Sequence, residues 1–251
     1  MDPVRKLADS RSNGASLPIL YEDADMVAVG KPAGLITHSD GRTEEATAEE
    51  WFKRTYPEAA AFPSDTPAGY VHRLDRDTSG VLVFAKNPSS YEFLRKAFHD
   101  REVKKTYLAF TYGTPKVKSG TIDFDIGRSR KDFRLRSAQR KAKGRLREAL
   151  TRYEVIGEIP EYGLFTVHPE TGRTHQIRVH LKAIHHPIIG DTLYAPNKPL
   201  ALGLTRLGLH AYQIDLPLPQ GGRTIITAPV PKDLALALAS FPEAAQQFAL
   251  E

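Results

Sequence analysis

The chain contains no cysteine. A disulfide framework, thiolate ligands for a metal and a thiol nucleophile are therefore excluded. Long apolar runs are also missing, because no stretch approaches the roughly 18 consecutive apolar residues of a membrane span. Charged side chains interrupt the segment 1–21, which lacks the apolar region of a secretory signal. We expect a cytoplasmic protein that does not cross a membrane.

Sequence motifs for the common cofactors are absent as well. Neither Gly-x-Gly-x-x-Gly nor Gly-x-x-x-x-Gly-Lys-Ser/Thr occurs, which argues against a bound nucleotide cofactor. A Gly-x-Ser-x-Gly nucleophile elbow is also missing. Four histidines lie close together but lack the spacing, the intervening glutamate and the cysteine partners of a metal site: His175, His180, His185 and His186. We therefore expect neither a metal nor a cofactor.

The composition of the 251 residues is that of a folded protein, with 41% hydrophobic and 26% charged residues. Residues 1–16 show no periodicity and are predicted to form a flexible tail, which leaves residues 17–251 as one domain. Strand-like runs cluster, and helical patterns are inserted among them at irregular intervals. This order favours an α+β fold with a mixed, largely antiparallel sheet over a doubly wound parallel sheet.

The individual elements are predicted from periodicity and from turn residues. Apolar spacing of three and four residues predicts helices over residues 47–56, 89–100 and 174–183 and from Lys232 onward, with Thr174 as an N-cap. Runs of β-prone residues predict strands over 26–29, 80–86, 106–112, 120–126, 148–156, 164–168, 208–214 and 224–227. Proline and two glycines predict a turn over 30–34.

Positive charge is concentrated in one segment of the chain, whose net charge is +5. Between Arg128 and Arg147 stand ten basic residues and a single acid, Asp132. Such a segment is typical of proteins that bind a phosphate backbone. The alternative is a solvated loop whose charge only aids solubility. We expect a long hairpin or loop over the sheet, with RNA contacts from Arg130, Lys131, Arg134 and Arg136.

Three segments concentrate residue types that carry chemistry. Residues 72–80 alternate two carboxylates with two guanidiniums before a Thr-Ser-Gly turn and an apolar run. An arginine beside a carboxylate favours its charged form, and a positioned carboxylate is a nucleophile or a base. Tyr107 stands early in an apolar strand, where a ring can stack on a base. Residues 171–181 place two arginines at a predicted helix start, which favours an anion in front of them.

Together these segments resemble the RluA-type pseudouridine synthases, enzymes that isomerise uridine to pseudouridine within structured RNA. The resemblance covers roughly residues 20–230. The family's His-Arg-Leu-Asp, two freer positions and Thr-Ser-Gly stand at 72–80, its strand tyrosine at Tyr107, and its Gly-Arg-Thr-His-Gln-Ile-Arg segment at 172–178. Smaller landmarks agree at residues 31–35, at 186–191 with Tyr194, and at 209–211.

Three features depart from the family pattern. Gly30 stands where an asparagine is frequent, and His185 stands where a glycine often precedes His-Pro. Both changes are expected to affect loop packing only. Many relatives also carry an N-terminal S4-like RNA-binding domain, which we expect this chain to lack, because about sixteen residues precede the first predicted strand. Target selection is then expected to come from the catalytic domain.

The resemblance implies a bent sheet with flanking helices and a central RNA-binding cleft. It makes Asp75 the catalytic carboxylate, which either attacks C1′ of the ribose or removes the 2′-proton. Arg178 is the implied ion-pair partner of Asp75, and Tyr107 is expected to pack against the uracil and to carry the proton removed from C5. Arg73 is expected to enter the space left by the everted nucleotide. Further substrate contacts are expected from His72, Arg173 and His175.

The expected substrate is a stem-loop of ribosomal RNA, transfer RNA or both, because extruding a base costs less from a loop than from a helix. The chain is expected to act as a monomer. One alternative is an RNA-binding or assembly factor of the same fold that has lost activity. Another is an N-glycosidase, which would release free uracil. The presence of Asp75, Tyr107 and Arg178 favours the synthase over the inactive factor.

Overall fold

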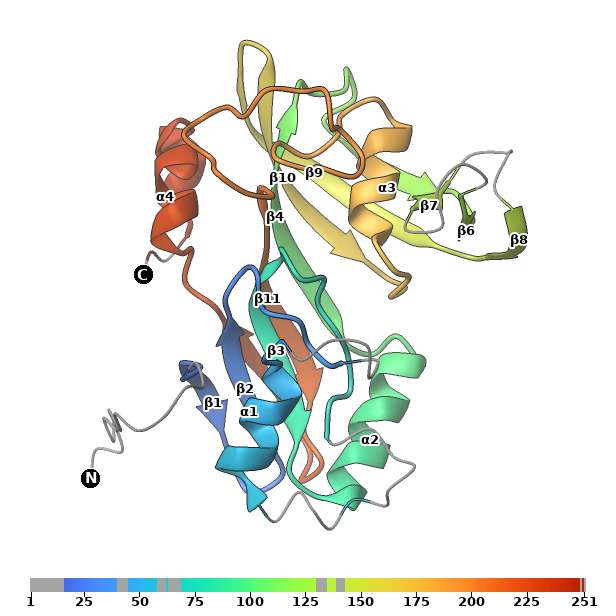
Figure 1. The fold of residues 1–251 in the computed structure, drawn as a ribbon, viewed down its shortest axis with the longest axis vertical. Coiled ribbons are helices and arrows are strands. Elements are labelled where there is room, and N and C mark those ends of the chain that lie inside the picture. Colours follow the sequence, from blue (N-terminus) through green and yellow to red (C-terminus); the bar gives the residue numbers. More distant parts are fainter. Residues whose placement is uncertain are drawn as a thin grey trace.

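A computed structural model gives the architecture of the chain (Figure 1). It describes residues 16–39, 45–57, 62, 69–129, 135–138, 143–248 and 250, with the backbone alone for 143–145. The predicted tail therefore lies almost wholly outside the described residues. No helix in these ranges combines the length and the apolar character needed to cross a membrane.

A nine-stranded sheet runs through both halves of the molecule, in the order β1-β2-β3-β11-β4-β10-β9-β5, with β12 paired to β11. Its strands are β1 (Ile19–Glu22), β2 (Met26–Lys31), β3 (Ser79–Ala85), β4 (Lys104–Tyr112), β5 (Ser119–Asp123), β9 (Leu150–Ile159), β10 (Tyr162–Pro169), β11 (Leu209–Pro217) and β12 (Arg223–Thr227). All pairs are antiparallel except β3 with β11, where Ser79 lies opposite His210. The α+β prediction with a mixed, largely antiparallel sheet is confirmed.

The basic segment contributes a second, three-stranded sheet in the order β7-β6-β8. Its strands are β6 (Ile126–Arg128), β7 (Arg136–Ser137) and β8 (Lys143–Arg147). The prediction of one strand over 120–126 is wrong at its C-terminal end. The chain leaves the main sheet after Asp123, and Ile126 already belongs to β6. At that break the Phe124 carbonyl accepts a hydrogen bond from the His180 ring, 2.9 Å away, instead of a ladder partner.

Two helices begin where the sequence predicts. Helix α1 (Ala48–Thr55) starts at a capping box in which Thr47 and Glu50 each satisfy the other's backbone N–H. Helix α2 (Pro88–His99) is capped by Asn87, and its proline occupies the first turn, where no donor is lost. Near the C-terminus are α4 (Lys232–Ala239) and the short α5 (Pro242–Ala245).

Helix α3 (Gln176–Ala183) begins differently from the prediction. Thr174 is not the N-cap; His175 takes that position in a left-handed conformation, with φ 57° and no side-chain cap. The Gln176 side-chain oxygen instead accepts the backbone N–H of Arg173 at 3.0 Å and the Thr171 hydroxyl at 2.7 Å. This local network folds the loop back over the helix start, so the usual capping geometry is not needed.

The predicted turn over 30–34 also begins later, because β2 continues through Gly30 and Lys31. Both residues pair with the start of β3, which places the end of β2 beside the loop that contains Asp75. A side chain at position 30 would approach the Pro18 ring, which a glycine avoids.

Side chains from the two faces of the sheet form separate cores. On β4, Leu108 and Phe110 pack under α4, whereas Ala109 between them packs under α3. Helices α1 and α2 cover the lower half around β2 and β3, as Figure 1 shows. The C-terminal end of α2 and the N-terminal end of α3 therefore face a common space beside β4, where a cavity opens.

Candidate active site

The loop that carries Asp75 is fixed from both sides. Thr37 accepts the Leu74 N–H at 3.2 Å and donates its hydroxyl to the Leu74 carbonyl at 3.0 Å. On the other side, the Gly34 N–H donates to the Arg76 carbonyl at 2.9 Å. These bonds give the backbone at residue 75 little freedom, so its carboxylate is positioned before any substrate binds.

Lys31 is the largest polar group beneath this loop and is only 1% exposed. Its Nζ donates to three backbone carbonyls, those of Pro32 at 2.9 Å, Leu35 at 2.7 Å and Arg76 at 2.9 Å. Burial lowers the pKa of Lys31 to about 7, against the opposing attraction of Asp75 and its neighbour Asp77. The lysine thus ties the end of β2 to the loop that carries Asp75, a role that sequence reasoning missed.

Arg178 lies between two carboxylates. Its Nη1 is 3.3 Å from Asp75 Oδ2, and its Nε and Nη2 each donate to one oxygen of Asp191 at 2.8 Å. Burial acts to lower the pKa of Arg178, but its hydrogen bonds and charge attraction to Asp191, and then to Asp75, raise it. The predicted pairing with Asp75 is therefore present, and a buried second carboxylate, which the sequence analysis did not assign, holds the guanidinium in place.

Asp191 belongs to the 186–191 landmark, so a signal for it was available. Its side chain is fully buried, and its Oδ1 also accepts the backbone N–H groups of Leu193 and Tyr194 at 3.0 and 2.9 Å. The Arg178 guanidinium stacks on the Tyr194 ring at 5.1 Å. Arg178 is thus held on two sides and is free to present only one edge to Asp75.

Tyr107 extends from β4 into the same cavity as Asp75. Burial, with the negative charge of Asp75 as a second cause, raises the pKa of Tyr107. Its phenol therefore stays protonated at neutral pH and is a hydrogen-bond donor. Ala211, a small residue, lies opposite it on β11 and leaves room beside the ring.

His175 and Arg136 meet at the Tyr194 hydroxyl. That oxygen lies 2.8 Å from His175 Nδ1 and accepts the Arg136 backbone N–H at 2.9 Å. Burial lowers the pKa of His175, which favours a neutral ring that can share this hydrogen bond. The contact joins β7 of the basic sheet to the start of α3, so the two predicted RNA-binding segments meet beside the cavity.

His72 and Arg73 differ in their surroundings. The His72 ring lines the cavity and stacks on Phe98 at 4.8 Å, while its Nε2 accepts the Val83 N–H at 3.0 Å. Burial lowers the pKa of His72 to about 3, so the ring is neutral. Arg73 is exposed, and its Nη1 lies 3.4 Å from Nε2 of His38, a ring that stacks on Tyr70 at 4.6 Å.

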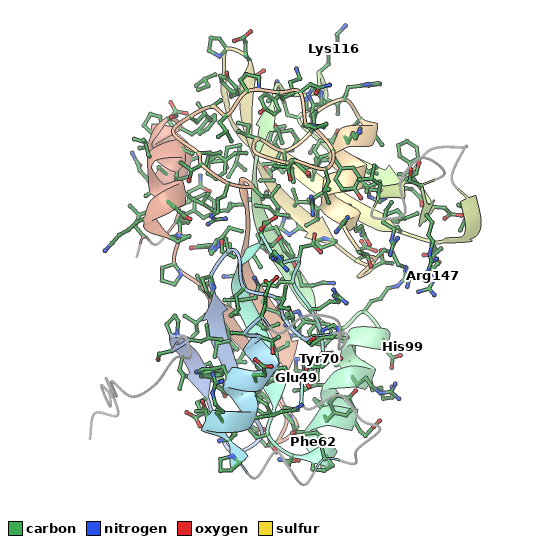
Figure 2. The ribbon with its side chains drawn as sticks, in the orientation of Figure 1. Glu49, Phe62, Tyr70, His99, Lys116 and Arg147 are labelled. Atoms are coloured by element: carbon green, nitrogen blue, oxygen red, sulfur yellow. The ribbon has the colours of Figure 1, made fainter. Side chains whose placement is uncertain are left out.

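Of the remaining predicted RNA contacts, one lines the cavity and three lie outside the described residues. Arg173 lines the cavity and donates its Nε to the Glu148 carbonyl at 2.9 Å, at the base of the basic sheet. Arg130, Lys131 and Arg134 lie outside the described residues. Figure 2 places Arg147, from the end of β8, above His99 of α2, on the side where the basic sheet approaches the lower half.

The cavity itself has a volume of about 600 Å³. Its walls come from the Asp75 loop, the end of α2, the start of β4 and residues 169–178. Among the described residues, two carboxylates line it, those of Asp75 and Glu170, against six arginine and lysine side chains: Arg73, Arg95, Arg101, Lys105, Arg173 and Arg178. Within the ranges the structure describes, no group of three or more His, Asp or Glu is placed to hold a metal. This lining suits a polyanion.

Comparisons with known proteins identify the family of the chain. A family model for RNA pseudouridylate synthase matches residues 25–183. An RNA pseudouridine synthase of Mycobacterium bovis is 40% identical over 225 residues, which cover 88% of this chain and 72% of the relative. The ribosomal large subunit pseudouridine synthase D of Nitrosomonas europaea is 34% identical over 251 residues, which cover 94% and 71%.

Among solved structures, the human RNA Pseudouridylate Synthase Domain Containing 4 superposes with a TM-score of 0.71 and 25% identity, covering 93% of this chain and 94% of that one. The human Domain Containing 1 protein superposes with a TM-score of 0.68 and 26% identity. The chain therefore belongs to the RNA pseudouridylate synthase family, as its RluA-type motifs predicted, and is an enzyme that isomerises uridine in RNA.

Proposed function

We propose that the chain converts a uridine in a stem-loop of ribosomal or transfer RNA, with Asp75 as the catalytic carboxylate. The observation that carries the proposal is the Asp75 side chain, 19% exposed in a basic cavity, with Arg178 Nη1 at 3.3 Å. A single carboxylate is sufficient because the reaction breaks N1–C1′ and joins C5 to the same sugar, with no external nucleophile. A glycosidase usually requires two carboxylates about 5–10 Å apart, and the second carboxylate of this cavity, Glu170, is already paired with Arg152 at 2.6 Å.

Asp75 acts by one of two routes in this proposal. It either attacks C1′ and holds the ribose while the uracil turns, or removes the 2′-proton and leaves a glycal. In both routes Arg178 keeps the carboxylate aimed at the ribose after water has left the cavity. The clamp by Asp191 supports this role, because a guanidinium already bonded on two nitrogens loses little freedom when substrate enters.

Tyr107 packs against the uracil and relays the C5 proton in this proposal. Its position on β4, its place in the cavity wall and its retained proton support that assignment. Arg73 fills the space that the everted nucleotide leaves, which its exposure and its contact with His38 allow. His72 serves chiefly to support the loop, because its accepting nitrogen is already bonded to β3.

The test is product analysis of transcribed ribosomal and transfer RNA after incubation with the enzyme. We expect pseudouridine at one or a few sites, with no free uracil in the supernatant. Mapping pseudouridine in total RNA from cells with and without the protein then identifies the target. Free uracil without pseudouridine would instead show a glycosidase, and RNA binding without any product would show an inactive factor.

A further inference from the structure

One cation in the cavity wall has no role in the mechanism above. Lys105 stands two residues before Tyr107 on β4, so both side chains point to the same face of the sheet, about 7 Å apart along the strand. Both line the cavity, together with the end of α2. Lys105 lies opposite Ile214 of β11, which offers it no polar partner.

The five arginines that line the cavity all have a partner. Each lies within hydrogen-bond or ion-pair distance of another group: Arg73 of His38, Arg95 of Glu92, Arg101 of Glu148, Arg173 of the Glu148 carbonyl, and Arg178 of Asp75 and Asp191. Across the residues that the structure describes, nothing pairs with the Lys105 ammonium. This side chain therefore has all three of its donors available to a ligand.

Among the described residues, no carboxylate compensates the charge of Lys105 from a distance either. Burial alone lowers the pKa of Lys105 to about 8, whereas Lys31, Tyr107 and His175 all respond to the charge of Asp75. Lys105 is half-buried in the cavity wall, so an anion that enters the cavity meets an ammonium with no competing partner among the described residues. The cavity therefore offers this cation to a negatively charged ligand.

We propose that Lys105 binds a backbone phosphate of the RNA adjacent to the everted uridine. The inference rests on the proposed function, in which the uracil lies on Tyr107 and the ribose faces Asp75. A phosphodiester fits better than a uracil carbonyl, because it carries a full negative charge and the cavity provides no such partner for this lysine among the described residues. The contact fixes the position of the nucleotide and takes no part in breaking or forming a bond.

The first test measures RNA affinity as a function of salt for the wild type and for Lys105→Gln. Loss of one phosphate contact should weaken binding about tenfold and reduce the slope of log K against log salt by about 0.7–0.9. Lys105→Arg should keep the slope, which separates loss of charge from misfolding. Lys116→Gln is the matched control, because that exposed lysine lies at the far end of the upper half (Figure 2).

The second test identifies the ligand atom. Methylphosphonate linkages, which remove one phosphate charge each, are placed singly on the 5′ and 3′ sides of the target uridine. At one position the wild type should lose as much affinity as Lys105→Gln loses on unmodified RNA, and Lys105→Gln should lose nothing further. Additive losses at both positions, or an unchanged salt slope, would overturn the phosphate assignment.

Failure of the proposed function gives a different result from failure of this inference. If the wild type forms pseudouridine but Lys105→Gln binds RNA like the wild type, the phosphate subsite is wrong and the function stands. If the wild type forms no pseudouridine on any RNA, the function itself fails.

Discussion

Arg178 is held by two carboxylates of unequal burial, and that inequality decides its geometry. Asp191 is fully buried and binds two of the guanidinium nitrogens, whereas Asp75 is partly exposed and meets the third at a longer distance. A buried pair whose members are both hydrogen-bonded is costly to break, because one charge is left without a partner. Asp191 therefore fixes the orientation of the Arg178 guanidinium, and Arg178 in turn positions the Asp75 carboxylate.

The substitution Asp191→Asn should lower the product rate at saturating RNA by about 10- to 100-fold, which is the usual range when a residue that orients an active-site group is changed. RNA affinity should change little, since Asp191 does not line the cavity. Single-turnover rates measured per folded enzyme provide the check. The control is Asp233→Asn, which removes the carboxylate partner of Arg206 away from the cavity; equal losses in both variants would contradict the role of Asp191.

Two histidines with strongly lowered pKa values should make the protein sensitive to acid. Burial lowers the pKa of His72 to about 3 and of His210 to about 4, both below the ordinary 6.5. The unfolded chain therefore takes up protons first, so stability is complete above about pH 6.5 and is lost as pH falls toward 4. The free energy of unfolding should drop by on the order of 2–3 kcal/mol per histidine by pH 4.

Denaturant unfolding at several pH values measures this effect. His72→Phe keeps a ring that can stack on Phe98 but cannot be protonated, so its stability should vary less with pH than that of the wild type. His99→Gln is the control, because His99 is 86% exposed. A wild-type stability that stays constant from pH 7 to 4 would refute the neutral state of the His72 ring.

Among the elements, the strands beneath Asp75 depend on close backbone contact. Gly80 pairs with Ala211 in the parallel ladder of β3 and β11 and has φ +123°, and a Cβ there would lie 2.2 Å from the Ala211 carbonyl oxygen. Backbone atoms cannot move aside as a flexible side chain does. The glycine of the Thr-Ser-Gly turn, five residues after Asp75, is therefore required by the sheet.

Substituting Gly80→Ala should destabilise the fold by about 2–4 kcal/mol, the sum of backbone strain and overpacking. The measurement is the free energy of unfolding in denaturant. Gly172→Ala gives the comparison, because its Cβ would meet no atom within 4 Å and its φ is ordinary. Similar stabilities for the two variants would show that β3 and β11 separate easily.

Local signals predicted many elements because they act within one turn or strand. Thr47 is the N-cap of α1 and Pro88 is the first residue of α2, in agreement with helix capping rules. The start of α3 was missed because Gln176, a residue inside the helix, satisfies the loop that precedes it. The end of β5 was missed because a histidine from α3, 56 residues away in sequence, takes the Phe124 carbonyl.

Pairs between distant segments could not be read from residue spacing. Asp75 and Arg178 lie 103 positions apart and meet only because the sheet places the first loop opposite α3. The expectation of that pair came from the family resemblance. The isolation of Lys105 had no sequence signal beyond its alternation with Tyr107, because the absence of a partner is a property of the folded cavity.

At the scale of the molecule, β4 and β11 join two halves that each contribute one wall of the cavity. The lower half supplies the Asp75 loop and the end of α2, and the upper half supplies α3 with its clamp from Asp191. The basic sheet projects from the upper half on the same side as α3 (Figure 1). An RNA stem lying against it would bring its loop to the cavity.

The most direct measurement of the central claim is single-turnover pseudouridine formation by Asp75→Asn, made alongside its RNA affinity. The rate should fall by about 10⁴-fold or more, as for other essential catalytic groups, with affinity within a few-fold of the wild type. Asp77→Asn, which alters a neighbouring carboxylate that does not line the cavity, should keep most of its activity. Turnover retained by Asp75→Asn would contradict the assignment of that carboxylate to the reaction.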